Sequence, residues 1–202
     1  MLHSFAFSNF QSFRERTEVS WLLDGRVPPD VWSGTATSGE RVSSVMAVIG
    51  PNASGKTALL KPILFLDWFV RQSFASEPDA QLPLSPHAAS KNDVAEFEVE
   101  ADVDGRLMRY TLRCTTQRVI HEALYAKHER MRYVFVREWN AGTQSYDVKQ
   151  QDFNFAPSEA RKVRPNASLI STAAQYGVPL AQQLGQTFVM TNIDNVGRMT
   201  KV

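Results

Sequence analysis

A short glycine-framed segment near the start of the chain has the residue types and spacing of a phosphate-binding loop. Gly50 and Gly55 enclose it, and Lys56 and Thr57 complete the pattern G-x-x-x-x-G-K-S/T. The two glycines let the backbone curl closely around a phosphate, and the loop N–H groups can point inward beside the positive end of the following helix. The pattern predicts that Lys56 lies at the β- and γ-phosphates and that Thr57 ligates Mg²⁺.

This loop predicts a site for ATP and Mg²⁺ in which Lys56 is the catalytic residue and Thr57 the metal ligand. With glycine at about 7% of residues, a chance match is expected in roughly one chain of this length per hundred. The residues predicted to contact the nucleotide are Gly50, Pro51, Asn52, Ala53, Ser54, Gly55, Lys56 and Thr57.

A strand and a helix must hold such a loop. Residues 42–49 are rich in valine, almost uncharged and followed by Gly50, which is typical of a strand buried on both faces of a parallel sheet. From about residue 55 to 73, apolar side chains recur with the helical period. Pro62 falls in the second turn, where we expect it to kink the helix or loosen one hydrogen bond.

The remaining chain changes its pattern several times. Residues 2–9 and 17–22 read as strands joined by a connection at 11–14, and residues 24–41 read as a loop. Residues 95–149 alternate with period two and predict an antiparallel meander of four or five strands. The predicted division is residues 1–74 with the loop strand and helix, 75–94 as a Pro-rich mobile surface loop, 95–149 as the meander, and 150–202 as a mostly helical segment, with helix around 167–184.

Composition excludes several classes of protein. The chain has 202 residues, a formal net charge of +1 and 43% hydrophobic residues, so it is neither a polycation nor a disordered tail. The most apolar stretch is too short to span a membrane, so no membrane partner is expected. Cys114 is the single cysteine, which excludes an internal disulfide. The N-terminus lacks the pattern of a signal peptide, so we expect a cytoplasmic protein.

The loop variant at residues 50–57 resembles the ABC-type ATPases of the SMC/RecF/OLD group. Residues 7–14, F-S-N-F-Q-S-F-R, are similar to the N-terminal strand and turn of that group. There the turn packs beside the nucleotide, which implies that Ser12 and Phe13 contact it; a plain strand-end turn is the alternative. The order of segments further resembles OLD-like AAA-type ATP-binding proteins of bacterial defence against phage. The implied fold is α/β, a P-loop NTPase core of ABC type with an antiparallel β-subdomain.

The resemblance also implies motifs that the sequence does not clearly contain. Residues 188–195 come nearest to a Walker B strand, but the apolar run is broken and Asn195 stands in place of the catalytic Glu. Residues 37–40 faintly resemble a signature loop, yet they precede the phosphate loop, so a flexible loop is the better reading. The chain therefore resembles the first half of a longer protein. In that protein, two heads would sandwich ATP as a homodimer or higher oligomer, with a TOPRIM-type or other nuclease as partner.

Other polar residues have weaker claims to a function. Gln151 and Gln175 are candidates for the glutamine that reaches the metal, although either fits an ordinary surface or helix position. The histidines show no metal spacing: His3, His87, His121 and His128. The acidic run reads as the solvated face of one strand: Glu96, Glu98, Glu100 and Asp102. The arginines of the meander could bind DNA or an acidic partner, or simply cover an ordinary charged sheet face: Arg109, Arg113, Arg118, Arg130, Arg132 and Arg137.

Three functions fit this sequence. The first is ATP binding by the N-terminal half of an OLD/ABC-type ATPase, with hydrolysis requiring a C-terminal half, in anti-phage defence or a DNA-associated process. The second is a non-hydrolysing, nucleotide-dependent module that docks a nuclease through the meander. The third is a P-loop phosphotransferase, which would need an arginine-rich lid that residues 75–94 do not provide.

Overall fold

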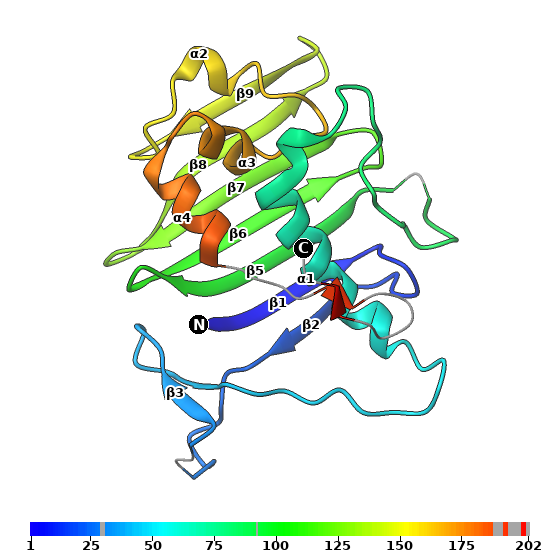
Figure 1. Cartoon of the computed structure of the whole chain (residues 1–202), viewed down its shortest axis with the longest axis vertical. Helices are drawn as coiled ribbons and strands as arrows, with labels where there is room; N and C mark the ends of the chain where they lie inside the picture. Colours follow the sequence, from blue (N-terminus) through cyan, green and yellow to red (C-terminus); the bar gives the residue numbers. More distant parts are fainter. Residues whose placement is uncertain (29–30, 92, 188–191, 194–198, 201–202) are drawn as a thin grey trace.

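The computed structural model describes residues 1–28, 31–91, 93–187, 192–193 and 199–200. Its largest element is a seven-stranded sheet with the strand order β2-β1-β5-β6-β7-β8-β9. Each neighbouring pair of strands in this sheet is antiparallel. Figure 1 shows the helices lying across one face of the sheet. The described residues therefore form a mixed α/β fold built on an antiparallel sheet.

The elements follow one another with short connections, apart from the long segments around α1. The sheet strands are β1 (Leu2–Ser8), β2 (Thr17–Ser20), β5 (Ala95–Val103), β6 (Arg106–Cys114), β7 (Val119–Lys127), β8 (Met131–Asn140) and β9 (Ser145–Gln150). Two short hairpins are β3 (Ser33–Thr35) with β4 (Arg41–Ser43), and β10 (Asn192–Ile193) with β11 (Met199–Thr200). The helices are α1 (Lys56–Gln72), α2 (Pro157–Ala160), α3 (Leu169–Gln175) and α4 (Pro179–Thr187), and a 3₁₀ turn covers Ser73–Ala75.

The antiparallel meander predicted from the alternating sequence is present as β5 to β9. Along β5 the apolar side chains point into the core, and the intervening acidic ones lie on the opposite face. Asp104 and Gly105 both have positive φ, 51° and 70°, as a two-residue hairpin turn between β5 and β6 requires. The period-two pattern therefore specified both the strands and the face that each of them buries.

Strand β1 connects the N-terminus to the meander. It pairs with β5 so that Phe5 lies opposite Val99 and Phe7 opposite Phe97, and it pairs on its other edge with β2. Between β1 and β2 the chain reverses tightly, because Phe10 and Phe13 exchange two backbone hydrogen bonds of 2.8 and 3.0 Å. The connection predicted at 11–14 is this turn.

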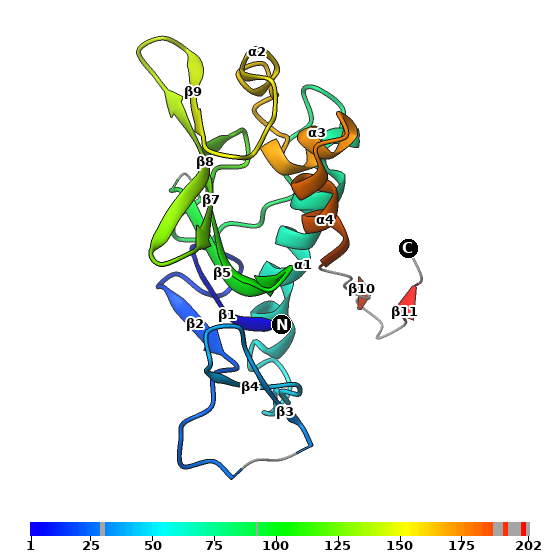
Figure 2. The ribbon, with the colours of Figure 1, turned by 90° about the vertical axis from the view of Figure 1, so that its left-hand side faces the viewer.

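Helix α1 packs across the sheet and closes the core. It buries a stripe of apolar side chains against the strands: Ile63, Phe65, Leu66, Phe69 and Val70. The ring of Phe65 packs at a tilt against that of Phe97, with ring centroids 5.0 Å apart, so aromatic rings fill the space between helix and sheet. Figure 2 shows α1, α3 and α4 on the same side of the sheet, and none of the described helices covers the other side.

The prediction of a strand over residues 42–49 is wrong for most of that range. Strand β4 ends at Ser43, and it pairs antiparallel with β3 rather than parallel inside the main sheet. Val45 is 54% exposed and Ile49 is 90% exposed. Within the described residues, the backbone groups of residues 46–49 have no hydrogen-bond partner. The segment has the composition of a buried strand, but nothing described here supplies the neighbouring strands that such a strand needs.

The described residues of the 75–94 segment contain no helix or strand beyond Ala75, as expected of a loop, but the segment is not simply a surface loop. Leu82 and Leu84 are buried in the core cluster. Asn166 donates to the backbone oxygens of Glu77 and Ala80 at 2.8 and 2.9 Å. These contacts fasten the segment to the body of the protein. Similarly, the loop predicted at 24–41 contains the short strand β3.

Two further expectations concern the C-terminal region and the membrane. The Walker B candidate at 188–195 lies outside the described residues, except for the two residues of β10. In the part of the chain that the structure describes, no helix combines the length and apolar character needed to cross a bilayer.

Candidate nucleotide-binding site

The loop at 50–57 leads into the first turn of α1. Gly55 is the residue that precedes α1, and its φ of 90° lies in the left-handed region that favours glycine. A Cβ atom at Gly50 would lie 3.0 Å from Oγ of Ser54, so a larger residue there would crowd the loop. The backbone therefore favours glycine at position 55 independently of any ligand, and at position 50 a side chain would require Ser54 to move.

The side chain of Lys56 is hydrogen-bonded to the backbone of the loop. Lys56 Nζ donates to the carbonyl oxygens of Gly50 and Pro51 at 2.8 and 2.6 Å. Residues 51–54 and Thr57 are exposed, so the loop and its first helical hydroxyl face solvent. The Lys56 ammonium, the Thr57 hydroxyl and the first backbone N–H groups of the seventeen-residue helix α1 thus lie together at the start of this helix. A cation and backbone N–H groups are what a phosphate needs, and a hydroxyl can ligate Mg²⁺.

The turn between β1 and β2 lies against this loop. Measured from an ideal Cβ position at Gly55, Oγ of Ser12 and Cζ of Phe13 are each 3.7 Å away. The Phe13 ring also packs edge-on against Phe7, with centroids 5.2 Å apart, so the core holds it in place. The structure therefore brings Ser12 and Phe13 to the side of the phosphate loop, although they lie more than forty positions away in the sequence.

Asn9 is a residue of this region whose role sequence reasoning missed. Its side-chain amide donates to the carbonyl oxygens of Ser90 and Asp93 at 3.1 and 2.9 Å, and its side-chain oxygen accepts from the N–H of His87 at 3.1 Å. Asn9 is buried and has a φ of 52°, a conformation that Asn tolerates better than most residues. It pins the end of the 75–94 segment to the turn that carries Ser12 and Phe13.

The two glutamine candidates do not lie near the loop. Gln151 follows β9, which is separated from β1 by four strands, about 24 Å at the usual spacing. Gln175 ends α3, and Ser171 of that helix accepts a hydrogen bond from the N–H of Phe74, just beyond the C-terminal end of α1. The phosphate loop lies at the opposite end of α1, about 25 Å away for a helix of this length.

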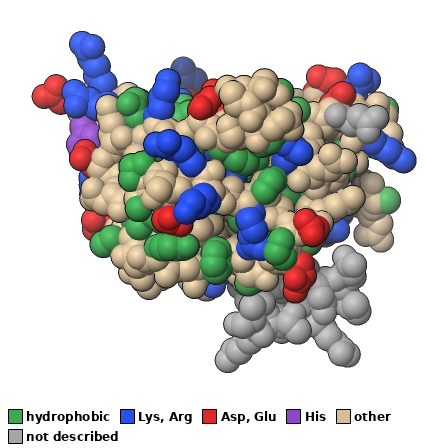
Figure 3. All heavy atoms as spheres, turned by 90° about the horizontal axis from the view of Figure 1, so that it is seen from above, with side chains coloured by type: hydrophobic (Ala, Val, Ile, Leu, Met, Phe, Trp, Pro, Cys, Tyr) green, Lys and Arg blue, Asp and Glu red, His purple; other side chains and the backbone are tan. Residues whose placement is uncertain are grey.

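Several charged side chains of the meander form ion pairs with one another. Arg109 contacts Glu100 at 2.5 Å and Arg113 contacts Glu96 at 3.1 Å, across the outer face of β5 and β6. On the face drawn in Figure 3, basic and acidic side chains are interspersed. The described residues contain no cluster of His, Cys, Asp or Glu that could hold a metal ion. The expectation of a solvated acidic face holds for Glu96, whose side chain is 49% exposed, but not for Asp102, whose side chain is 12% exposed and lies 3.2 Å from the buried His3.

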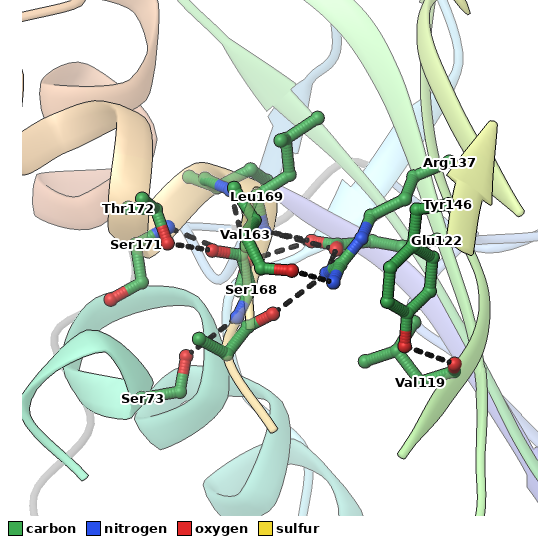
Figure 4. Close-up of polar contacts among 12 residues, drawn as sticks. Ser73, Val119, Glu122, Arg137, Tyr146, Val163, Ser168, Leu169, Ser171 and Thr172 are labelled. Atoms are coloured by element: carbon green, nitrogen blue, oxygen red, sulfur yellow. Dashed lines mark hydrogen bonds and ion pairs between the residues drawn. The ribbon is translucent and has the colours of Figure 1, made fainter. Parts of the chain in front are cut away.

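Arg137 corrects the expectation that the arginines of the meander lie on the surface. Its guanidinium is fully buried, 3.3 Å from the buried carboxylate of Glu122, and it donates to the carbonyl oxygens of Val163, Arg164 and Ala167 at 2.8 Å each. The Glu122 carboxylate also accepts from the side chain of Ser168 and the backbone N–H of Leu169. Figure 4 shows this network joining two strands to the start of α3.

The Glu122 network also affects its neighbours on β6. Tyr110 donates its hydroxyl proton to Glu122 at 3.0 Å. Burial, together with the Glu122 charge, raises the pKa of Tyr110 well above its ordinary value. The same two causes raise the pKa of the Cys114 thiol. These groups therefore stay neutral in the core, and the network is structural.

Comparison with known families matches residues 45–169, more than half of the chain, to a family described as an AAA domain; the same description names the AbiEii toxin and a type IV TA system. The chain belongs to this AAA-domain family. An AAA domain is a nucleotide-binding ATPase domain, and the match begins just before the phosphate loop and ends at the start of α3. No curated protein matches the sequence.

Proposed function

We propose that this AAA domain binds ATP with Mg²⁺ at residues 50–57, flanked by Ser12 and Phe13. The observation that carries the proposal is the loop geometry: Gly55 in the left-handed region, immediately followed by Lys56, whose ammonium is held over the backbone curl. Lys56 would contact the β- and γ-phosphates, and Thr57 would ligate the metal. The bound metal would neutralise phosphate charge during transfer.

Equilibrium binding of ATP tests this proposal directly. Lys56→Ala should abolish ATP binding, because it removes the cation from the phosphates. Lys162→Ala is the matched control, since its side chain is 71% exposed and paired only with Glu159 on the surface. Equal ATP affinity of Lys56→Ala and the wild type would contradict the proposal.

The metal ligand can be tested separately. Thr57→Val keeps the branched shape of the side chain and removes its hydroxyl. We expect ATP binding by Thr57→Val to lose its dependence on Mg²⁺, whereas wild-type binding should weaken when the metal is chelated. A Mg²⁺ dependence that is the same in both proteins would show that Thr57 is not the ligand.

The exposed segment at residues 45–49 supports a further part of the proposal. Its valine-rich composition, its mostly exposed side chains and the lack of described backbone partners at residues 46–49 suit a strand that joins additional β-strands. We propose that polypeptide outside the described residues supplies these strands, together with the acidic residues needed for hydrolysis. The described chain would then bind ATP without turning it over efficiently.

This segment also favours a second candidate function, a non-hydrolysing module whose nucleotide controls an interaction. Phosphate release by the purified chain, compared with its ATP affinity, tests the premise that the two candidates share, namely that the chain alone does not hydrolyse ATP efficiently. Binding with very slow or no turnover would agree with the present proposal and keep the second candidate open. Robust turnover by the chain alone would refute both the need for a further half and the non-hydrolysing module.

The wider biological role rests on the sequence resemblance alone. On that basis we propose that the complete protein acts as a homodimer or higher oligomer, in anti-phage defence or a DNA-associated process. A TOPRIM-type or other nuclease is the proposed partner. Size determination with and without ATP tests the oligomer, and an unchanged monomer under both conditions would count against it.

A further inference from the structure

One edge of the large sheet has no neighbouring strand among the described residues. That edge is β9, which pairs with β8 in a register without a shift and forms the outermost strand in Figure 1. At the other end of the sheet the chain after β2 is bonded to β4, because Leu23 donates to Arg41 and Ser43 donates to Trp21 through their backbones at 2.8 and 2.9 Å. Strand β9 contains neither a proline nor a bulge, two features that commonly prevent pairing at an exposed edge.

The backbone groups along this edge are free. Just beyond β9, the N–H of Gln151 donates to the carbonyl oxygen of Val134 at 2.7 Å. Inward and outward residues alternate along an antiparallel pair, so Tyr146, Val148 and Gln150 direct their backbone N–H and C=O groups away from β8. Within the described residues, no hydrogen bond involves these backbone groups. Strand β9 therefore offers a regular row of donors and acceptors to one further strand.

The charges beside the edge are unbalanced. Glu138 of β8 lies directly opposite Asp147 of β9, and like charges in such positions destabilise a sheet. Asn140 donates to the Asp147 carboxylate at 3.1 Å, but no ion pair between described residues involves Glu138, Asp147 or Lys149. Lys149 is exposed and lies two residues after Asp147, on the same face of the sheet. A strand with a cation opposite Asp147 and an anion opposite Lys149 would balance these charges.

We propose that β9 is a homodimer interface, at which it pairs antiparallel with β9 of a second copy about a two-fold axis through Val148. In this register Asp147 lies opposite Lys149 of the second copy, and Lys149 lies opposite its Asp147. Both pairs fall at non-hydrogen-bonded positions, where side chains on neighbouring strands come closest. A shift by two residues would place either Asp147 or Lys149 opposite itself. Charge therefore selects one register, and the two-fold symmetry satisfies it twice.

The dimer joins two seven-stranded sheets into one continuous sheet. The outward residues of the two strands form three pairs that exchange about six backbone hydrogen bonds. The interface lies far from the phosphate loop, because β9 is separated by four strands from β1, whose following turn carries Ser12 and Phe13. This contact therefore needs no nucleotide, does not rest on the proposed function, and differs from the sandwich of two heads around ATP that the sequence resemblance implies.

Sedimentation equilibrium of the full chain over a range of concentrations, with and without ATP, tests the proposal. The wild type should be a dimer under both conditions. Lys149→Glu and Asp147→Lys each place like charges opposite one another, so each should weaken the dimer by at least about tenfold. Lys127→Glu is the matched control and should leave the dimer unchanged, because Lys127 is an exposed lysine of the same sheet on β7, a strand that is paired along both edges.

Mixing the two charge variants gives the sharpest test of the register. A heterodimer of Lys149→Glu with Asp147→Lys has opposite charges at both positions, so the mixture should dimerise although neither variant does so alone. Val148→Pro removes the central outward N–H and leaves every hydrogen bond to β8 in place, so it should also give a monomer. Circular dichroism checks that each variant is folded, and the mixture remains decisive if Val148→Pro is not.

The outcomes separate this inference from the proposed function. Recovery of the dimer in the mixture supports the inference, whether or not the chain binds ATP. A monomeric wild type at all concentrations overturns it, and so does a dimer that the β9 variants leave unchanged. A dimer that forms only with ATP also overturns it, while agreeing with a sandwich of two heads and leaving ATP binding by residues 50–57 intact.

Discussion

Replacing Glu122 by Gln should be among the most destabilising conservative changes in this protein. The carboxylate is fully buried and accepts hydrogen bonds from Ser168 at 2.7 Å, Leu169 at 3.0 Å and Tyr110 at 3.0 Å, in addition to its ion pair with Arg137. Gln keeps the size of the side chain, so no cavity forms. However, it removes the negative charge and turns an NH₂ group toward groups that are themselves donors.

The magnitude follows from what remains buried after the change. Arg137 keeps its three carbonyl partners but loses its counter-charge, and breaking one partner of a buried ion pair costs about 3–5 kcal/mol. For a chain of this length, each 1 kcal/mol lowers the thermal midpoint by roughly 2–4 °C. We therefore expect Glu122→Gln to lower the midpoint by about 6–20 °C, and the free energy of unfolding by a large part of the 5–15 kcal/mol typical of a domain.

Urea unfolding followed by circular dichroism measures this cost. Glu96→Gln is the matched control, because Glu96 forms an ion pair of similar length, 3.1 Å, with Arg113, and both side chains are nearly half exposed. An exposed pair of this kind contributes about 0–1 kcal/mol. If Glu122→Gln proved no more costly than Glu96→Gln, burial would not govern the strength of this network and the reasoning would be refuted.

Three further predictions concern the core and the region around the turn at Asn9. Cys114 should resist alkylation in the folded protein, because burial and the raised pKa of its thiol disfavour the reactive thiolate, and it should react once urea unfolds the chain; rapid labelling of native protein would contradict this. Asn9→Ala should cost about 2–4 kcal/mol in urea unfolding, since it strands three backbone groups and places Ala at positive φ; a cost below 1 kcal/mol would count against the pinning role. Burial raises the pKa of Asp102, but the His3 ring, whose Nε2 lies 3.2 Å from the carboxylate, and the hydrogen bond from the N–H of Thr37 outweigh it and hold that pKa below its ordinary value. The stability that this carboxylate contributes is therefore present above its unfolded-state pKa and is lost as pH falls through its folded-state pKa. The difference in thermal midpoint between wild type and Asp102→Asn should therefore narrow from about pH 6 to about pH 3. A difference that stays constant over this range would refute the prediction.

Local pattern was sufficient to predict the meander and α1. In β5 and β6 buried side chains alternate with more exposed ones, apart from the exposed Arg106 at the start of β6, and the Asp104–Gly105 turn follows from backbone geometry alone. The phosphate loop is likewise local, since Gly50, Gly55 and Lys56 are close in sequence and their conformation depends on one another. Both features are specified within a few residues, so a single sequence reveals them.

Features that depend on distant partners could not be predicted in this way. Arg137 lies among exposed arginines in sequence, and only the carbonyl groups of residues 163–167 explain why it is buried. For residues 45–49 the prediction was wrong in the opposite sense, because they were expected to be buried and are mostly exposed. Their composition shows which environment suits them, but not whether neighbouring strands are present. The partners of Asn9 lie about eighty residues away, so no local signal marked its role.

The pairing of β1 with β5 also bears on the order in which the chain folds. Hairpins β5 to β9 join residues close in sequence, whereas Phe7 pairs with Phe97 across a segment that contains the whole phosphate loop and α1. Closing so long a segment is entropically costly and slow compared with hairpin formation. We expect the meander to form first and β1 to dock last. Because Ser12, Phe13 and the loop meet only after that docking, ligand binding would report on the final step of folding rather than on the appearance of the sheet.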